Sequence, residues 1–386
     1  MMIKKRKGSN LLLRLILMNH LITGGAGFIG SHLADALIAR GDNVRLFDNL
    51  EEQVHGGCLP AYLSPRAEFI KGDVRDPEAL AQALKGIEVV IHCASAVGVA
   101  QSQYEIKRYC DVNVGGTANL LDIIINEKLP IKKILLPTSM TSYGEGCYRC
   151  SSHGTVRPGL RTEEQLSLHD WQLHCPECGT IVDPIPTPED AERQSGTIYA
   201  LSKNMQEDMV MNIARTYKVP AVALRLFNVY GPRQSLSNPY TGVTAIFMSR
   251  LKNGQPPVLY EDGEQSRDFI SVHDVVSAFI AAMDSDRADG QVLNIGSGQM
   301  TPIKDIALSL AELTGKDITP SIPGNFRKND VRHCFADRSR AEKLLRWKPT
   351  VSLSTGLQEL VTWAEDQTAE DKFAQAEKIL RNKGLT

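Results

Sequence analysis

Tyr199 and Lys203 are the residues whose types and spacing most directly suggest chemistry. They stand four positions apart in Tyr199-Ala-Leu-Ser-Lys203, so they share one face of the helix expected over 199–215. An ammonium beside a phenol favours the phenolate, and the pattern therefore predicts that Lys203 lowers the pKa of Tyr199. Ser139 ends a predicted strand and could hold the same substrate oxygen. Because such pairs are also common on helix surfaces, the interpretation depends on the other motifs.

A glycine-rich segment predicts a dinucleotide site. Gly24, Gly27 and Gly30 follow a predicted strand, and the expected helix begins with Phe28 and Ile29. In this context the first glycine permits a tight turn, the second brings backbone close to a pyrophosphate, and the third allows close helix packing. The N-terminus of the helix then faces the anion. Glycines in a purely structural turn are the alternative.

Three further residues are predicted to bind the adenosine half of the cofactor. Asp48 ends the second predicted strand, where a carboxylate can accept hydrogen bonds from the ribose hydroxyls. The same carboxylate would repel a 2′-phosphate, so NAD is favoured over NADP. Asp73 and Val74, at the end of the third predicted strand, are placed to flank adenine. An exposed loop aspartate is the alternative for Asp48.

Two Cys-x-x-Cys pairs predict a metal site. The pairs are Cys147 with Cys150 and Cys175 with Cys178, a pattern that suits one tetrahedral zinc held by four thiolates. Four protein ligands leave no open position for water, so the expected zinc is structural. Two disulfides or two unrelated pairs are the alternatives.

The other cysteines and the nearby histidines receive no chemical role. Three histidines could replace a cysteine as ligand, but four available thiolates favour a surface position for them: His153, His169 and His174. The remaining cysteines are expected to be small buried residues, a common position for free thiols: Cys58, Cys93, Cys110 and Cys334.

The elements that must position these residues predict an α/β fold. Short apolar strands and amphipathic helices alternate from Met18 to about Leu136, which indicates a doubly wound, Rossmann-type parallel sheet. We expect a nucleotide-binding domain over 18–230 with a zinc-ribbon-like insert over 145–194. A smaller mixed α/β lobe for substrate should occupy mainly 231–363. The tail, 364–386, has the charge of a solvated surface helix.

Charge and termini limit the remaining classes. The 386 residues carry a net charge of −2, so no overall basic field favours nucleic acid. Residues 1–17 place a basic cluster before a short apolar run, as a secretory signal does. Arg14 interrupts that run and the run continues into the glycine strand, so we expect an extension ahead of Met18. No other stretch is apolar enough to span a bilayer, and the cytoplasm is the expected compartment.

Several segments together resemble the nucleotide-sugar epimerase/dehydratase family of extended short-chain dehydrogenases. They are TGGAGFIG, GDVRD, NVGGT, TSMTSYGEG, YALSK, LRLFNVYGP and RDFISVHDV. The resemblance runs from Met18 to about Trp363 and implies that Tyr199 removes the proton from a sugar 4-hydroxyl while hydride passes to NAD. It also implies that Lys203 holds the nicotinamide ribose and lowers the Tyr199 pKa, and that Ser139 binds the 4-oxygen.

The family also supplies expectations for the substrate and for assembly. Asn228, Arg267 and Arg332 match positions that hold the nucleotide diphosphate of the substrate. Family members commonly form homodimers through a helix bundle that includes the Tyr199 helix, and a homodimer is therefore expected.

The residues after Ser139 bear on the reaction. Dehydratases of the family carry Asp-Glu there and decarboxylating relatives carry Glu, whereas this chain has Met140 and Thr141. Neither side chain is a useful acid or base, so chemistry confined to the 4-position is expected, which is 4-epimerisation. The insert resembles that of the dTDP-L-rhamnose 4-epimerase subfamily. A 4-ketoreductase or dehydrogenase that exchanges its cofactor is the first alternative, and a non-catalytic scaffold or nucleic-acid binder is the second.

Overall fold

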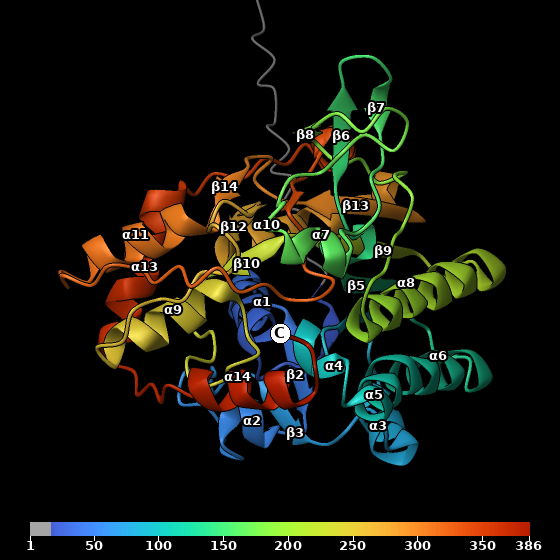
Figure 1. Cartoon of the computed structure of the whole chain (residues 1–386). Helices are drawn as coiled ribbons and strands as arrows, with labels where there is room; N and C mark the ends of the chain where they lie inside the picture. The colour runs from blue at the N-terminus through green and yellow to red at the C-terminus, as the bar shows by residue number, and fades with distance from the viewer. Residues whose placement is uncertain (1–16) are drawn as a thin grey trace, which may run out of the picture.

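The computed structural model describes residues 17–386, and the expected extension ahead of Met18 lies, apart from Leu17, outside the described residues. A seven-stranded sheet with strand order β13-β9-β5-β4-β1-β2-β3 forms the larger part of the molecule (Figure 1). Every pair of neighbours in it is parallel. The strands are β1 (Asn19–Thr23), β2 (Asn43–Asp48), β3 (Glu68–Lys71), β4 (Val89–His92), β5 (Lys133–Ser139), β9 (Ala221–Leu226) and β13 (Gln291–Ile295).

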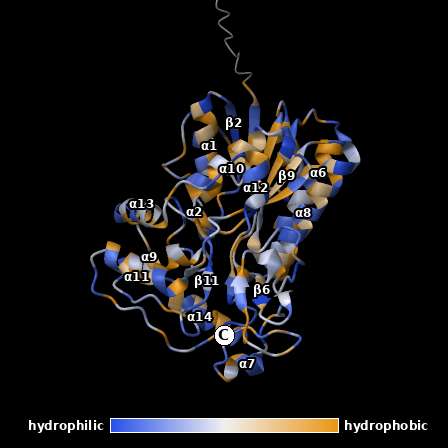
Figure 2. Cartoon of the chain, turned by 90° about the horizontal axis from the view of Figure 1, so that it is seen from above, coloured by the Kyte–Doolittle hydropathy of each residue, from blue (hydrophilic) through white to orange (hydrophobic). Residues whose placement is uncertain are grey.

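Helices cover both faces of this sheet, so its central strands are buried along their whole length. One face is covered by α1 (Phe28–Arg40), α10 (Val272–Met283) and α12 (Ser339–Leu345). The other is covered by α3 (Pro77–Leu84), α6 (Gly116–Asn126) and α8 (Ile198–Tyr217). All residues of β4, β5 and β9 are buried, as expected for strands of a doubly covered parallel sheet. Figure 2 shows hydrophobic residues along β9. The predicted α/β sheet is confirmed.

The strand order places the candidate residues at one edge of the sheet. The chain reverses direction across the sheet between β1 and β4, and ligands of such sheets bind beyond the carboxyl ends of the strands at that point. The glycine segment follows β1, Asp48 ends β2 and Ser139 ends β5. The short helices α2 (Glu52–His55), α4 (Val99–Ser102) and α5 (Ile106–Tyr109) follow β2 and β4 in the sequence.

A smaller lobe packs beyond this edge. Its helices are α9 (Val243–Lys252), α11 (Ile303–Leu313) and α13 (Leu353–Glu365), which share one apolar core. Its short strands form two sheets, β10 (Asn228–Tyr230) with β12 (Phe269–Ser271), and β14 (Thr301–Pro302) with β11 (Ser266–Arg267) and β15 (His333–Cys334). The expected boundary at 231 does not separate the parts, because α10, β13 and α12 return to the large sheet.

Residues 145–194 form a module with a small sheet of its own, whose strands lie at the top of Figure 1. Its last part returns to the large sheet, where Glu189 accepts hydrogen bonds from Asn294 of β13 and Arg225 of β9. The three antiparallel strands of the module are β6 (Cys147–Cys150), β7 (Gly154–Val156) and β8 (Asp183–Ile185), and its helix is α7 (Glu163–Ser167). Only a few apolar side chains are buried inside it, among them Tyr148, Leu173 and Val182. The chain ends in α14 (Phe373–Asn382). Between residues 17 and 386 no helix has both the length and the apolar character needed to cross a membrane.

Candidate active site

The glycine segment has the backbone geometry of an anion site. Gly24 adopts φ 65°, and a Cβ there would lie 2.7 Å from the backbone nitrogen of Ala94. A Cβ on Gly30 would lie 2.4 Å from the carbonyl oxygen of Gly24, so only glycine allows α1 to pack this closely. Gly27 caps α1 without any side-chain hydrogen bond, so no side chain of the cap residue satisfies the first amides of α1. Binding of the cofactor by the amides of Phe28 and Ile29 remains a prediction.

Asp48 helps to shape the same loop. One carboxylate oxygen accepts a hydrogen bond from the Ala26 backbone amide (3.0 Å) and the other from the Leu50 amide (2.8 Å). The side chain is buried and still has acceptor capacity on both oxygens. These bonds fit a carboxylate that receives ribose hydroxyls, and selection of NAD over NADP by Asp48 remains a prediction.

Asp73 and Val74 lie in the segment that follows β3. The Asp73 carboxylate accepts hydrogen bonds from Arg75 (2.7 and 2.9 Å) and from Asn49 Nδ2 (2.9 Å). The bonds from Arg75 hold the pKa of Asp73 at about 2, so this carboxylate is ionised. Val74 is buried, and a Cβ on Gly116 would lie 2.4 Å from one of its methyl groups. Contact of either residue with adenine remains a prediction.

Tyr199 and Ser139 come together at the carboxyl edge of the sheet. Thr197 begins α8 by accepting a hydrogen bond from the Ala200 amide (3.2 Å), and the Tyr199 amide donates to Ser102 Oγ (3.0 Å). These bonds fix the first turn of α8, and the Ser139 hydroxyl lies near enough to the Tyr199 phenol to lower its pKa. Lys203 lies one turn further along α8 and is 4% exposed. The structure therefore brings the predicted catalytic residues together.

Asn113 connects the Tyr199 helix with the loop that follows β4. It lies in a π-helical turn, Cys110–Gly115, between α5 and α6. Its side-chain oxygen accepts a hydrogen bond from the Ala96 amide (2.7 Å), and its nitrogen donates to Ser202 Oγ on α8 (2.9 Å). Such turns are frequent at functional sites because they displace a side chain from the regular helical register.

The structure does not bear out the predicted lowering of the Tyr199 pKa by Lys203. Burial raises the pKa of Tyr199 to about 12, and only the hydrogen bond from Ser139 opposes this. Burial also lowers the pKa of Lys203 to about 8, against the attraction of Cys93 and Glu207. Both effects have one cause, since removal from water disfavours the charged form of each group.

A cavity of about 340 Å³ opens beside Tyr199, a volume in the range of small-molecule sites. Met140 and Thr141 line it, and Thr141 donates a hydrogen bond to Ser139 Oγ (2.9 Å). Val97 and Leu160 add apolar wall. The two residues after Ser139 therefore face the cavity without any acid or base.

Two of the three predicted substrate residues line this cavity. Asn228 does so, and its buried Oδ1 has no hydrogen-bond partner within residues 17–386. Arg267 does so as well and donates to Asp330 Oδ1 (2.9 Å). Arg332 does not reach the cavity: it is 1% exposed and donates to Glu261 (3.0 Å) and to Asp262 (2.6 and 2.8 Å). The substrate role predicted for Arg332 is corrected, because these carboxylates occupy its guanidinium.

Arg327 takes the place expected for Arg332. It lines the cavity, its guanidinium carbon lies 4.0 Å from the centre of the Tyr260 ring, and its buried Nε has no partner in the described chain. Both arginines belong to the charged segment Arg327-Lys-Asn-Asp-Val-Arg332. The sequence contains the signal for a cationic segment, but only the path of the chain decides which arginine faces the ligand.

The C-terminal helix α14 also lines the cavity, contrary to the expected solvated helix. Phe373, Ala376 and Leu380 are buried along one side of α14, and Glu377 of the helix and Leu385 beyond its end also line the cavity. In Figure 1, α14 runs across the front of the molecule. The spacing of the three buried residues is helical, which could have indicated an apolar face beneath the charges.

A cluster in the module has the geometry of a metal site. Ligand atoms of Cys150, His153, Cys175 and Cys178 all lie within 4.8 Å of one another. Cys150 Sγ lies 3.7 Å from Cys178 Sγ, and His153 Nδ1 lies 3.5 Å from the Sγ atoms of Cys150 and Cys175. Ligands of a tetrahedral zinc lie about 3.8 Å apart for two sulfurs and about 3.6 Å apart for sulfur and nitrogen, given the usual bond lengths. The residues present therefore fit zinc.

Cys147 lies outside this cluster, which corrects the predicted four-thiolate set. Cys147 and Cys150 both belong to β6, and residues three apart in a strand point to opposite faces. Cys147 Sγ instead lies 3.7 Å from Arg157. His169 and His174 are also outside the cluster, since His169 stacks on Trp171 and His174 hydrogen-bonds to Asp170.

The cysteines differ in exposure from the expectation. All eight have free thiols, which rules out the two disulfides in this structure. Cys334 is buried as expected, but Cys58 and Cys110 are exposed and Cys93 is half-buried. Backbone hydrogen bonding from Ser152 lowers the pKa of Cys150 to about 5, so its thiolate form is favoured.

Comparison with known proteins agrees with this geometry. Residues 20–161 and 178–296 match the NAD dependent epimerase/dehydratase family, and the gap between them falls inside the module. The chain is 37% identical over 350 residues to the dTDP-L-rhamnose 4-epimerase of Burkholderia thailandensis, covering 89% of this chain and 94% of that protein. The chain belongs to the NAD dependent epimerase/dehydratase family.

Solved structures of nucleotide-sugar 4-epimerases are similar to this chain. The UDP-glucose 4-epimerase of Thermotoga maritima, with UDP-glucose, matches with a TM-score of 0.74 and 32% identity over 90% of this chain and 99% of that one. The UDP-glucuronic acid 4-epimerase of Bacillus cereus, in complex with UDP-glucuronic acid and NAD, matches with a TM-score of 0.71 and 26% identity over 90% of this chain and 99% of that one. The predicted class, an NAD-dependent nucleotide-sugar epimerase, is confirmed.

Proposed function

We propose that this enzyme inverts the configuration at C4 of a nucleotide-linked 6-deoxyhexose, with dTDP-L-rhamnose as the substrate to test first. The observation that carries this is the cavity wall beside Tyr199, which holds Met140 and Thr141 where an acid or base would act beyond C4. Val97 and Leu160 add apolar wall to the same cavity, which suits a methyl group better than a carboxylate at that wall. The similarity to the dTDP-L-rhamnose 4-epimerase supports the choice.

The side chains account for the proton steps. Tyr199 takes the proton of the sugar 4-hydroxyl during oxidation and returns it during reduction, and Ser139 donates a hydrogen bond to the 4-oxygen. When bound, NAD would supply the hydride acceptor and donor for C4, and its positive charge would favour the Tyr199 phenolate. Gly24, Gly27 and Asp48 would hold it at the edge of the sheet. Inversion requires the intermediate 4-ketosugar to present its other face before the hydride returns.

The diphosphate of the substrate is assigned to Arg267 and Arg327. Both guanidinium groups line the cavity, and arginine binds phosphate oxygens in a fixed geometry. Asn228 contributes an amide whose Oδ1 is unpartnered in the described residues.

The assay offers dTDP-L-rhamnose to the enzyme without added cofactor and identifies the product by NMR. We expect the 4-epimer at equilibrium with the substrate and no net change in NADH absorbance. Stoichiometric production or consumption of NADH would instead support the ketoreductase or dehydrogenase. Tyr199→Phe is the control and should give no product, because it lacks only the group that moves the proton.

The module is proposed to hold one structural zinc through Cys150, His153, Cys175 and Cys178. Three thiolates and one imidazole leave no position for substrate or water, so the metal would order the module and take no part in hydride transfer. The module buries few apolar side chains, and metal binding would therefore supply much of its folding free energy.

Assembly as a homodimer is proposed through the outer side of α8. Leu201 and Met205 are one turn apart there and are 53% and 49% exposed, and Ile106 of α5 is 49% exposed. Because α5 packs against α8, these apolar side chains belong to adjacent elements. A second copy of the chain would bury the apolar residues of both.

A further inference from the structure

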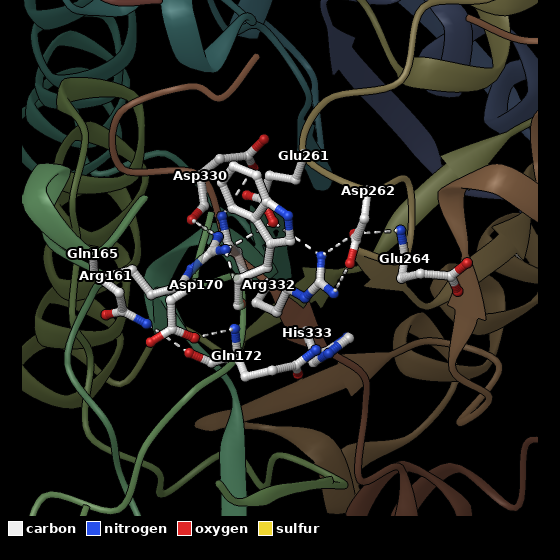
Figure 3. A network of polar contacts seen from close by, with 12 residues as sticks. Arg161, Gln165, Asp170, Gln172, Glu261, Asp262, Glu264, Asp330, Arg332 and His333 are labelled. Atoms are coloured by element: carbon white, nitrogen blue, oxygen red, sulfur yellow. Dashed lines mark hydrogen bonds and ion pairs between the residues drawn. The ribbon is translucent and has the colours of Figure 1, made fainter. Parts of the chain in front are cut away.

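Arg161 connects the module with the segment that lines the cavity. Its side chain is 1% exposed, and one terminal nitrogen donates to Glu261 (2.8 Å) and to the Trp171 carbonyl (3.1 Å). The other terminal nitrogen donates to the carbonyl of Asp330 (3.1 Å). Asp330 lies in the cavity-lining segment 327–331. One guanidinium thus joins three parts of the chain that are far apart in sequence (Figure 3).

The charges around Arg161 make this geometry rigid. Arg161 Nε lies 3.6 Å from Glu145, and the side chains of Glu145 and Glu261 are fully buried. Arg332 donates to the same oxygen of Glu261 (3.0 Å), and its backbone amide donates to Glu145 (2.8 Å). A buried carboxylate is costly without its cation, so neither arginine can leave the network without a penalty. The network therefore fixes the position of residues 330–332 relative to the module.

Contacts also run from the metal cluster to this network. Leu173 packs in the small core that contains Cys150 and Cys175. Two residues earlier, the backbone carbonyl of Trp171 accepts a hydrogen bond from Arg161. The Trp171 ring stacks on His169 with ring centres 5.1 Å apart, and its centre lies 6.4 Å from that of the Phe326 ring. Phe326 directly precedes Arg327, whose guanidinium lines the cavity.

We propose that Arg161 is a positioning residue, through which the metal-binding module fixes segment 327–331 and so sets the affinity for the nucleotide end of the substrate. Arg161 acts through Asp330 and Trp171 and does not touch the substrate itself. The inference rests on the proposed function for the chemical nature of the ligand, a nucleoside diphosphate.

The test uses Arg161→Lys in the NAD-loaded enzyme. Lysine keeps a positive charge between Glu145 and Glu261, but its single ammonium cannot replace the fork that reaches both Trp171 and Asp330. We expect dTDP and UDP to bind about tenfold more weakly by calorimetry, because binding would then have to order segment 327–331, which the wild type holds in place. The loss should appear in KM rather than in kcat, with unchanged affinity for NAD.

Two matched variants calibrate the result. Arg149→Lys makes the same replacement at an exposed position of β6 and should bind both nucleotides as the wild type does. Arg327→Met removes the proposed contact with the diphosphate itself, so it should show the largest loss of nucleotide affinity. Wild-type affinity in a folded Arg161→Lys enzyme would overturn the inference. A wild-type enzyme that binds neither nucleotide would contradict the proposed function instead.

Hydrogen exchange in the wild-type enzyme tests the same coupling without a variant and without nucleotide. Removal of the metal by a chelator should speed exchange in peptides that cover 326–331, while peptides of β4 and β5 keep their protection. Unchanged exchange in 326–331 after complete metal removal would overturn the coupling, even if Arg161→Lys failed to fold. A purified wild-type enzyme that contains no metal would overturn it as well.

Discussion

Tyr199 and Lys203 stand one helical turn apart on α8, where Lys203 is buried and Tyr199 is half-buried at the cavity wall. The sequence predicts the pair and its neighbour Ser139, because an i, i+4 spacing and a strand end are local features. It does not predict the direction of the Tyr199 pKa, since burial depends on α4, α5 and the sheet. Desolvation disfavours the charged form of each group, so it raises the pKa of Tyr199 and lowers that of Lys203.

The pKa of Lys203 leads to a prediction for stability. Below about pH 8 the amine is charged in both states and the folded state bears the cost of burying it. Between about pH 8 and the model-compound value of 10.5 the folded protein loses this proton first, and the cost disappears. Lys203→Met should therefore stabilise the cofactor-free protein at pH 7 by about 3 kcal/mol, at 1.36 kcal/mol per pKa unit.

Urea unfolding of the wild type and Lys203→Met at pH 7 and at pH 10 measures this difference. The gain should be largest at pH 7 and mostly lost at pH 10. A variant that is less stable than the wild type at pH 7, or a difference independent of pH, would show that Lys203 is stabilised by contacts that outweigh its desolvation.

The metal cluster shows what element geometry adds to a motif. Cys-x-x-Cys predicts a knuckle, and Cys175 with Cys178 behaves as one, since both join the cluster. The first pair lies in the regular strand β6, so Cys147 points away and His153, at the turn before β7, takes its place. Whether residues 147–150 form a strand or a turn depends on their pairing with β7 and β8, and no local sequence pattern shows that pairing.

Elemental analysis of matched cysteine variants tests this ligand set. We expect about one zinc per wild-type chain and in Cys147→Ser, and loss of zinc in Cys175→Ser and His153→Ala, because a tetrahedral site requires all four ligands. NAD binding should persist in all three variants, since the large sheet has its own core. Zinc loss in Cys147→Ser with retention in His153→Ala would restore the four-thiolate site.

At the scale of the whole molecule, the cavity is built from parts that the sequence does not connect. The sheet edge and the glycine loop are predictable because apolar strands, amphipathic helices and turn residues alternate regularly along 18–139. Arg327 and α14 reach the cavity only through the path of the last sixty or so residues, and the module reaches it through Leu160 and Arg161. These contacts depend on tertiary packing, which overrides a charged local pattern.

The exposed side of α8 gives a prediction at this scale. Replacing Leu201 by Glu places a charge in the proposed interface and should shift the enzyme from dimer to monomer in sedimentation velocity, while NAD binding persists. Leu308→Glu, at an exposed position of α11, is the control and should leave the assembly unchanged. A wild-type enzyme that sediments as a monomer would contradict the proposed dimer.

The most direct test of the central claim follows the hydrogens of the sugar. The enzyme is incubated with dTDP-L-rhamnose in D₂O, and the product is analysed by NMR and mass spectrometry. Chemistry confined to C4 predicts the 4-epimer with its original hydrogen at C4 and no carbon-bound deuterium, because the hydride remains on the bound cofactor and Tyr199 exchanges only the hydroxyl proton. Deuterium at C3 or C5 would contradict the account, since it requires an acid or base that Met140 and Thr141 cannot supply.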